Sequence, residues 1–202
     1  MEKTFGDHRP LPGDRGLYEV RFHGRGGQGT VVASVLLAKA AFLEGRGVQA
    51  FPFFGVERRG APVVAYTRIG SGPVRLGGSI TNPDALIVMD TSLLVSLKDT
   101  WLQGLRPGGH VLLNRPTVPE ELRQGSDHHK IRCIDAGSIA LRHHLGSPSN
   151  PLVNTVILGA FARMTGIVSL EALEEAVRTR VPGQLRENLE ALNEAWETVE
   201  VS

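Results

Sequence analysis

The glycine-rich segment at residues 24–29, which reads GRGGQG, constrains the fold of this chain more than any other feature of its sequence. Residues 17–23 before it alternate and carry β-forming side chains, which predicts a strand. Residues 30–43 after it form an alanine-rich apolar run that stops at Gly45 and Gly47, which predicts a buried helix. A strand, a tight glycine turn and a helix in succession are typical of the start of an α/β fold.

The rest of the chain continues the alternation of strands and helices. Further strands are predicted at residues 48–54, 61–69, 84–90, 110–114 and 130–135. Further helices are predicted at residues 92–105, 138–145, 152–164, 170–181 and 185–199. This order predicts an α/β fold: a doubly wound, mostly parallel Rossmann-like sheet with a helical C-terminal end. We expect one such domain over residues 17–202, preceded by a flexible N-terminal extension over residues 1–16.

The glycine segment contains the residue types expected of a loop that holds an anion. Glycines let the backbone turn sharply and approach a ligand closely, and the helix that follows offers unpaired N–H groups. The arginine adds a positive charge, and the glutamine can both donate and accept hydrogen bonds. The candidate cofactor-binding residues are Gly24, Arg25, Gly26, Gly27, Gln28 and Gly29. A tight turn that binds no ligand is the plainer interpretation of the same residues.

A dinucleotide-binding site needs more than these glycines. An acidic residue about 20 residues further on normally binds the ribose hydroxyls. That position falls in the second predicted strand, where residues 48–54 read VQAFPFF and include no acid. A free-standing NAD enzyme is therefore disfavoured.

A second charged segment, residues 57–63, reads ERRGAPV and lies between two apolar stretches. Two adjacent arginines on a turn cannot both point the same way. One can therefore form bidentate hydrogen bonds with a phosphate or carboxylate while the other pairs with Glu57. Arg58 and Arg59 are therefore candidate anion contacts. The aromatic residues at 51–54 are more typical of an interface than of open solvent, and an ordinary solvated turn is the alternative.

Composition narrows the range of functions. The 202 residues include 22 Lys and Arg and 21 Asp and Glu, so nothing in the overall charge favours a nucleic-acid or membrane partner. No apolar run approaches the roughly 20 residues that cross a bilayer, and the polar first residues do not resemble a signal peptide, so we expect a cytoplasmic protein. Cys133 is the only cysteine, so this chain alone cannot hold an iron–sulfur cluster or a structural zinc ion. A buried, inert thiol is favoured over a reactive one at this position.

Three further features have a structural as well as a functional interpretation. The histidine pairs at 128–129 and 143–144 do not share a helical face, which favours surface residues over metal ligands. Asn154, at the start of an apolar helix, either caps a turn or contacts a partner, and capping is favoured. The last predicted helix has one apolar stripe, which we expect to pack on the chain's own sheet rather than on another subunit. The stripe consists of Leu185, Leu189, Leu192 and Trp196.

Residues 24–69, in which GRGGQG and ERRGAPV occur together, resemble the gamma subunit or gamma domain of pyruvate and related 2-oxoacid:ferredoxin oxidoreductases. Shorter segments at residues 135–140, 154–160 and 188–196 also fit, so the resemblance spans roughly residues 17–200. Either motif alone would be a weak signal, whereas the pair at this spacing is specific.

The resemblance implies a division of labour between subunits. Such complexes use thiamine diphosphate with Mg to attack the oxoacid, iron–sulfur clusters to pass electrons to ferredoxin, and coenzyme A to collect the acyl group. This chain has no Gly-Asp-Gly segment for thiamine diphosphate and only one cysteine. Subunits of the alpha, beta and delta type are thus implied to carry the redox chemistry, and this chain is implied to have no catalytic residue and no metal ligand.

For this chain the resemblance implies a structural subunit that contributes to coenzyme A binding through its glycine loop and through Arg58 and Arg59. The complex would act on pyruvate or a related 2-oxoacid, and the isolated chain is expected to form a homodimer through its partner surfaces. The alternative is a stand-alone nucleotide-binding Rossmann protein, either a reductase or a sensor, which would bind a nucleotide without partners.

Overall fold

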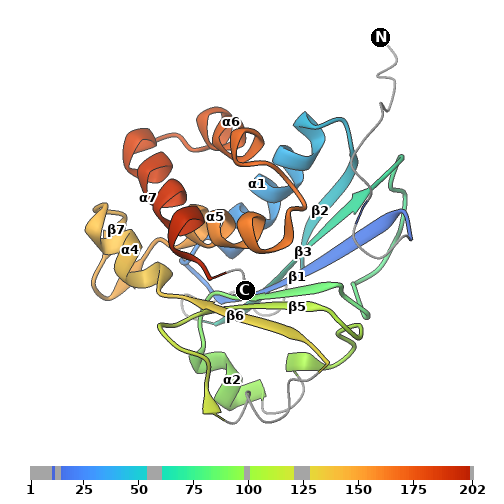
Figure 1. Cartoon of the computed structure of the whole chain (residues 1–202), viewed down its shortest axis with the longest axis horizontal. Coiled ribbons are helices and arrows are strands. Elements are labelled where there is room, and N and C mark those ends of the chain that lie inside the picture. Colours follow the sequence, from blue (N-terminus) through green and yellow to red (C-terminus); the bar gives the residue numbers. More distant parts are fainter. Residues whose placement is uncertain (1–10, 12–14, 54–60, 98–100, 121–127, 201–202) are drawn as a thin grey trace.

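The computed structural model describes residue 11 and residues 15–53, 61–97, 101–120 and 128–200 (Figure 1). Its strands are β1 (Leu17–Arg25), β2 (Gly47–Phe53), β3 (Pro62–Gly70), β4 (Ala85–Val88), β5 (His110–Asn114), β6 (Lys130–Ile134), β7 (Gly146–Ser147) and β8 (Asn150–Pro151). Its helices are α1 (Thr30–Leu43), α2 (Ser92–Leu97), α4 (Ala136–Arg142), α5 (Asn154–Thr165), α6 (Leu170–Arg180) and α7 (Leu185–Thr198). The helix predicted at residues 30–43 is confirmed residue for residue.

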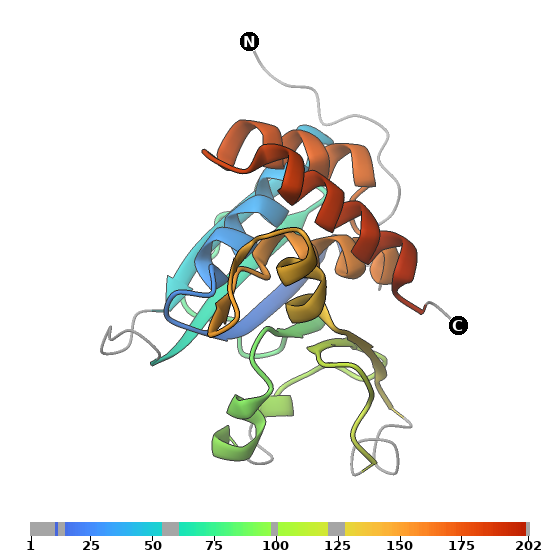
Figure 2. The same ribbon diagram turned by 90° about the vertical axis from the view of Figure 1, so that its left-hand side faces the viewer.

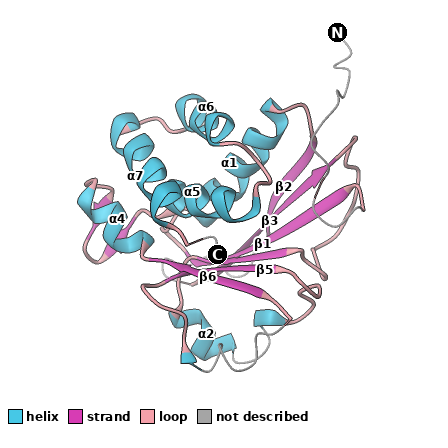
Figure 3. Ribbon diagram, viewed as in Figure 1, coloured by secondary structure: helices cyan, strands magenta, loops and turns pink. Residues whose placement is uncertain are grey.

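Six strands form one sheet in the order β2-β3-β1-β4-β5-β6 (Figure 3). The pairs β1–β4, β4–β5 and β5–β6 are parallel, whereas β3 is antiparallel to both β1 and β2. Strand β3 is reversed because it follows β2 after residues 54–61, and a parallel pair needs a crossover of a dozen or more residues. The predicted doubly wound, mostly parallel sheet is confirmed, with β3 inserted between β1 and β2.

Helices cover the two faces of this sheet unequally. Helices α1, α5, α6 and α7 lie on one face, and α2 lies on the other (Figures 1 and 2). Side chains of β1 alternate between the faces, and Val20 and Phe22 are fully buried in the larger core under the helices. A smaller cluster, which includes Leu86, Val88 and Trp101, fills the opposite face.

The C-terminal helices pack mainly on one another. Helix α7 contacts α5 above all, and also α6 and α4, so the prediction that its apolar stripe packs on the sheet was wrong. Leu192 is fully buried between these helices, while Leu189 and Trp196 are partly buried against the same core. Leu185, at the start of the stripe, remains exposed. No helix in the described part of the chain is long and apolar enough to cross a bilayer.

Two predicted helices have different limits in the structure. The helix predicted at residues 138–145 begins at Ala136, because the Asp135 carboxylate accepts a hydrogen bond from the Ser138 N–H at 3.0 Å. Helix α2 covers only the start of the helix predicted at residues 92–105, and Trp101 lies in a later 3₁₀ turn.

Three described residues of the N-terminal extension contact the domain. Leu11 is buried in the larger core, and the Arg15 guanidinium forms an ion pair with the Asp84 carboxylate just before β4. The Gly16 carbonyl accepts a hydrogen bond from the Ser71 N–H at 3.0 Å. The described part of the extension is therefore anchored at these three points.

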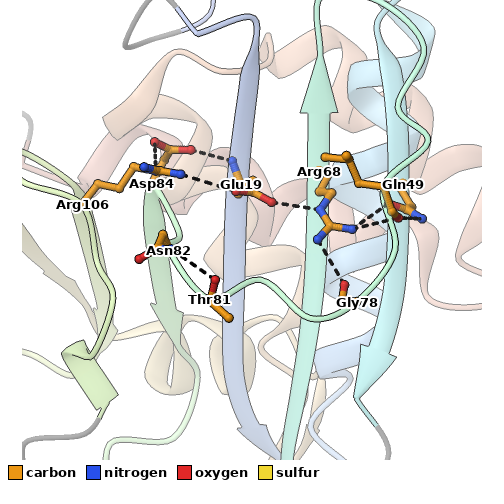
Figure 4. Close-up of polar contacts among 9 residues, drawn as sticks. Glu19, Gln49, Arg68, Gly78, Thr81, Asn82, Asp84 and Arg106 are labelled. Carbon is orange, nitrogen blue, oxygen red and sulfur yellow. Dashed lines mark hydrogen bonds and ion pairs between the residues drawn. The ribbon is translucent and has the colours of Figure 1, made fainter.

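A buried polar network joins neighbouring strands near the amino-terminal end of β1 (Figure 4). The Arg68 guanidinium donates to Glu19 Oε1 at 2.9 Å, to Gln49 Oε1 at 3.0 Å and to the Gly78 carbonyl at 3.1 Å. Asp84 Oδ2 accepts a hydrogen bond from the Glu19 N–H at 2.8 Å. Each charge is satisfied by partners, as buried charges must be if the domain is to stay folded.

Candidate functional site

The glycine loop, residues 24–29, lies at the edge of the sheet where the parallel strands end. It leads from β1 into α1 on one face, whereas the segment after β4 leads into α2 on the other face (Figures 1 and 2). The chain therefore leaves two adjacent parallel strands in opposite directions at this point. In open α/β sheets, ligands bind at such a crevice outside the carboxyl ends of the strands.

The loop is held by hydrogen bonds of its own backbone. The Gly26 N–H donates to the Ala61 carbonyl at 3.0 Å, and the Gln28 N–H donates to the Arg25 carbonyl at 3.1 Å. Gly29 is the N-cap of α1 at φ 79°, in the left-handed region that glycine enters without strain, and no side chain caps the helix there. The first N–H groups of α1 thus lie next to the loop without a side-chain cap, as in an anion-binding helix terminus.

Two asparagines from the C-terminal half cover the outer side of the loop. Asn150 Nδ2 donates to the Gly27 carbonyl at 3.4 Å, and a Cβ on Gly29 would lie 2.7 Å from Asn154 Nδ2. Asn154 is the first residue of α5, whose N-cap is Val153, and its Oδ1 accepts a hydrogen bond from the Thr155 N–H in the first turn at 2.9 Å. Its side chain also packs on the glycine loop.

A hollow of about 330 Å³ opens beside the loop. Three of the loop glycines line it with backbone atoms, and Val31, Val32 and Val63 supply apolar side chains. Thr30, which also lines it, is 3% exposed and its hydroxyl has no hydrogen-bond partner. The described lining has no histidine, cysteine or carboxylate, so it offers groups that bind a ligand rather than groups that transfer protons.

Four side chains link the glycine loop to the segment after β4. The Arg25 guanidinium lies 3.1 Å from Asp90 Oδ2 and 2.8 Å from the Ser92 hydroxyl, and Gln28 Nε2 donates to Asp90 Oδ2 at 3.0 Å. Burial alone would raise the pKa of Asp90, but hydrogen bonds from Ser92 and Gln28 and the charge of Arg25 outweigh it and lower the pKa. The carboxylate is therefore ionised near neutral pH.

The structure describes only one of the three arginines predicted to contact an anion. Arg25 lines the hollow, and its charge is balanced by Asp90. Arg58 and Arg59 lie outside the described residues. The described residues on either side of them, Phe53 and Ala61, lie at the same edge of the sheet as the loop, where Ala61 accepts the hydrogen bond from Gly26.

The sheet order also explains why the site departs from a dinucleotide fingerprint. Because β3 separates β1 from β2, the end of β2 lies two strand spacings, about 10 Å, from the end of β1. An acid at the end of β2 would be displaced from the ribose position even if the sequence had one there. No group of three His, Cys, Asp or Glu side chains in the described part of the chain could hold a metal ion.

The sequence interpretation did not identify Asp90, Ser92 or Asn150. Asp90 is the last residue of the strand predicted at residues 84–90, and the carboxyl end of a parallel strand is where such residues should be sought. No comparable signal marks Asn150, which reaches the loop from 123 residues further along the chain. Cys133, predicted to be buried, is half-buried on the edge strand β6.

Comparison with known proteins gives one consistent result. A family model for pyruvate ferredoxin/flavodoxin oxidoreductase matches residues 19–198. The chain is 49% identical over 184 residues to the pyruvate/ketoisovalerate oxidoreductases common subunit gamma of Thermococcus litoralis, covering 90% of this chain and 96% of that protein. It is 48% identical over 185 residues to pyruvate synthase subunit PorC of Methanothermobacter thermautotrophicus, covering 91% of this chain and 97% of that protein. Pyruvate oxidoreductase subunit PORC from Thermotoga maritima has a crystal structure similar to this one, with a TM-score of 0.77 and 37% identity over 92% of this chain and 98% of that one.

Proposed function

The chain belongs to the pyruvate ferredoxin/flavodoxin oxidoreductase family, and we propose that it is the gamma subunit of a 2-oxoacid:ferredoxin oxidoreductase that converts pyruvate or a related 2-oxoacid to an acyl-CoA. The observation that carries this proposal is the 49% identity to a gamma subunit of which the chain covers 96%. The resemblance inferred from the two sequence motifs is thereby confirmed. The stand-alone nucleotide-binding protein is not favoured, since the relatives are oxidoreductase subunits and β3 displaces β2 from the ribose position.

The composition of the chain supports a non-catalytic role within that complex. With one cysteine it cannot supply the four thiolates of an iron–sulfur cluster, and it lacks a Gly-Asp-Gly segment for thiamine diphosphate with Mg. These groups therefore belong to alpha, beta and delta-type partner subunits, and the electrons reach ferredoxin through them. We place the complex in the cytoplasm.

The glycine loop is the proposed contribution of this chain to coenzyme A binding. Its backbone and the uncapped start of α1 suit a pyrophosphate, and the valines of the hollow suit the apolar part of the same ligand. Coenzyme A supplies the thiol that takes the acyl group, and the role of this chain is to bind and orient it. The proposed contacts are Gly24, Arg25, Gly26, Gly27, Gln28 and Gly29, together with Arg58 and Arg59, which lie in sequence between β2 and β3.

The end of the β2–β3 hairpin is the proposed contact with other subunits. Phe53 is 57% exposed at the end of β2, and the sequence continues with a further phenylalanine at residue 54. Aromatic residues gathered in sequence at the end of a strand are more typical of an interface than of open solvent. In the isolated chain the same surface would favour a homodimer.

The test of the coenzyme A role uses the assembled complex. Arg58→Ala and Arg59→Ala should each weaken coenzyme A binding by roughly tenfold, because a hydrogen bond to a charged group is lost. Arg75→Ala, an exposed arginine beyond the opposite end of β3, is the matched control and should leave the Kd unchanged. Unchanged affinity in an intact complex would remove both arginines from this role.

A further inference from the structure

Asp90 connects two segments that lead to opposite faces of the sheet. Its Oδ2 accepts a hydrogen bond from Gln28 Nε2 at 3.0 Å and lies 3.1 Å from Arg25 Nε, both in the glycine loop. Its Oδ1 accepts a hydrogen bond from the Ser92 N–H at 3.0 Å. One carboxylate therefore joins the glycine loop to the segment that begins α2.

The Gln28 side chain carries this connection into the backbone of the loop. While its Nε2 donates to Asp90, its Oε1 accepts a hydrogen bond from the Arg25 N–H at 2.8 Å. An ionised carboxylate only accepts hydrogen bonds, so it fixes which end of the Gln28 amide faces Asp90 and which end faces the backbone. Asp90 thus determines the orientation of a side chain that holds the loop by its main chain.

We propose that Asp90 is a positioning residue for the coenzyme A contact, which orients the Gln28 amide and thereby fixes the backbone of the glycine loop. This inference rests on the proposed function, in which that loop faces the pyrophosphate. Asp90 does not touch the ligand in this account. Its effect reaches the ligand through Gln28 and the loop N–H groups, whose hydrogen bonds depend on correct placement.

The structure suggests a rescue that a merely structural role would not show. Asp90 accepts from Gln28 Nε2 with one oxygen and from the Ser92 N–H with the other. In Asp90→Asn one of these two oxygens becomes an N–H donor, so two donors face each other and the connection between the two segments breaks. Adding Gln28→Glu restores the pairing, because the amide N–H introduced at position 90 now faces a carboxylate oxygen introduced at position 28. The second oxygen of that carboxylate can again accept from the Arg25 N–H. The double variant also keeps one negative charge beside Arg25.

The experiment measures the KM for coenzyme A, kcat and hydrogen exchange of the loop in the assembled complex. Asp90→Asn should raise the KM by roughly tenfold and speed exchange at Gln28, because the loop loses its preorganised geometry. At saturating coenzyme A, kcat should change little. Asp90→Asn with Gln28→Glu should restore slow exchange at Gln28, because the hydrogen bonds that hold the loop are rebuilt. Unchanged exchange in Asp90→Asn, or exchange that stays fast in the double variant, would overturn the inference.

A separate variant tests the proposed function itself. Val32→Glu places a negative charge in the hollow without touching Asp90 or Gln28, and it should raise the KM for coenzyme A. If Val32→Glu leaves the KM unchanged while Asp90→Asn still speeds loop exchange, the coenzyme A contact is wrong. If Val32→Glu raises the KM but Asp90→Asn changes neither KM nor exchange, the positioning role is wrong.

Discussion

The hydroxyl of Thr30 lies so close to Gly24 that a Cβ added to Gly24 would lie 2.1 Å from Thr30 Oγ1. Thr30 is 3% exposed at the first position of α1, and a β-branched side chain has few alternative rotamers in a helix. The close contact between the end of β1 and the start of α1 therefore requires glycine at position 24.

Gly24→Ala should lower the free energy of unfolding by about 1–3 kcal/mol, because either Thr30 or the loop must shift. Gly77→Ala is the matched control, since a Cβ there would meet nothing within 4 Å, and it should change stability by less than about 0.5 kcal/mol. Chemical denaturation of both variants checks the prediction. Equal stability of the two would show that Thr30 moves without cost.

The strand–loop–helix unit could be predicted because its signals are local. An apolar run of helical length and the surrounding glycines set the limits of α1, and both lie within a few residues. The position of β3 between β1 and β2 could not be predicted. A β2–β3 hairpin can join the sheet with either of its two strands next to β1. That choice depends on contacts between residues far apart in sequence.

The candidate site was predictable only in part for the same reason. The glycines that line the hollow are visible as a motif, but Asp90 meets Gln28 across 62 residues and Asn150 meets Gly27 across 123. Only one of the two contacts of Asn154 was predictable. A short polar residue at the start of an apolar helix predicts a cap, and Asn154 Oδ1 accepts a hydrogen bond from the Thr155 N–H, but the close approach of its side chain to Gly29 has no local signal.

The buried pair of Arg68 and Glu19 should contribute strongly to stability. Their side chains are 4% and 11% exposed, so Arg68→Met leaves a carboxylate deprived of its nearest cation. Breaking a buried pair on one side costs about 3–5 kcal/mol, and we expect a loss of that size in urea denaturation. Adding Glu19→Gln should recover part of the loss, because the unpaired charge is removed.

Arg186→Ala serves as the control for this pair. Arg186 forms an ion pair with Glu190 on the surface of α7, and removing it should hardly change stability. A loss for Arg68→Met as small as that of the control would contradict the buried-network interpretation.

His23 should make stability fall as the solution becomes acidic. Burial, with a smaller effect of Arg21, lowers the pKa of His23 to about 4 from its usual 6.5. Below pH 6.5 His23 is protonated in the unfolded chain but stays neutral in the folded chain. The free energy of unfolding therefore decreases as the pH falls from 6.5 towards 4. The loss is on the order of 3 kcal/mol for a shift of this size.

His23→Leu should therefore flatten the dependence of stability on pH between 6.5 and 4. Some slope should remain, since burial, with Lys130 and Arg132, also lowers the pKa of His110 to about 4. Denaturation curves at several pH values measure the difference. Parallel curves for the variant and the unchanged protein would show that His23 is not the source.

The most direct test of the central claim is to purify the tagged chain from its native host and measure what accompanies it. We predict co-purification in fixed ratio with larger chains that contain iron and thiamine diphosphate, and pyruvate- or 2-oxoacid-dependent reduction of ferredoxin by the assembly. The chain expressed alone should show no turnover. A chain that purifies without partners, binds a nucleotide and turns over a substrate by itself would contradict the account.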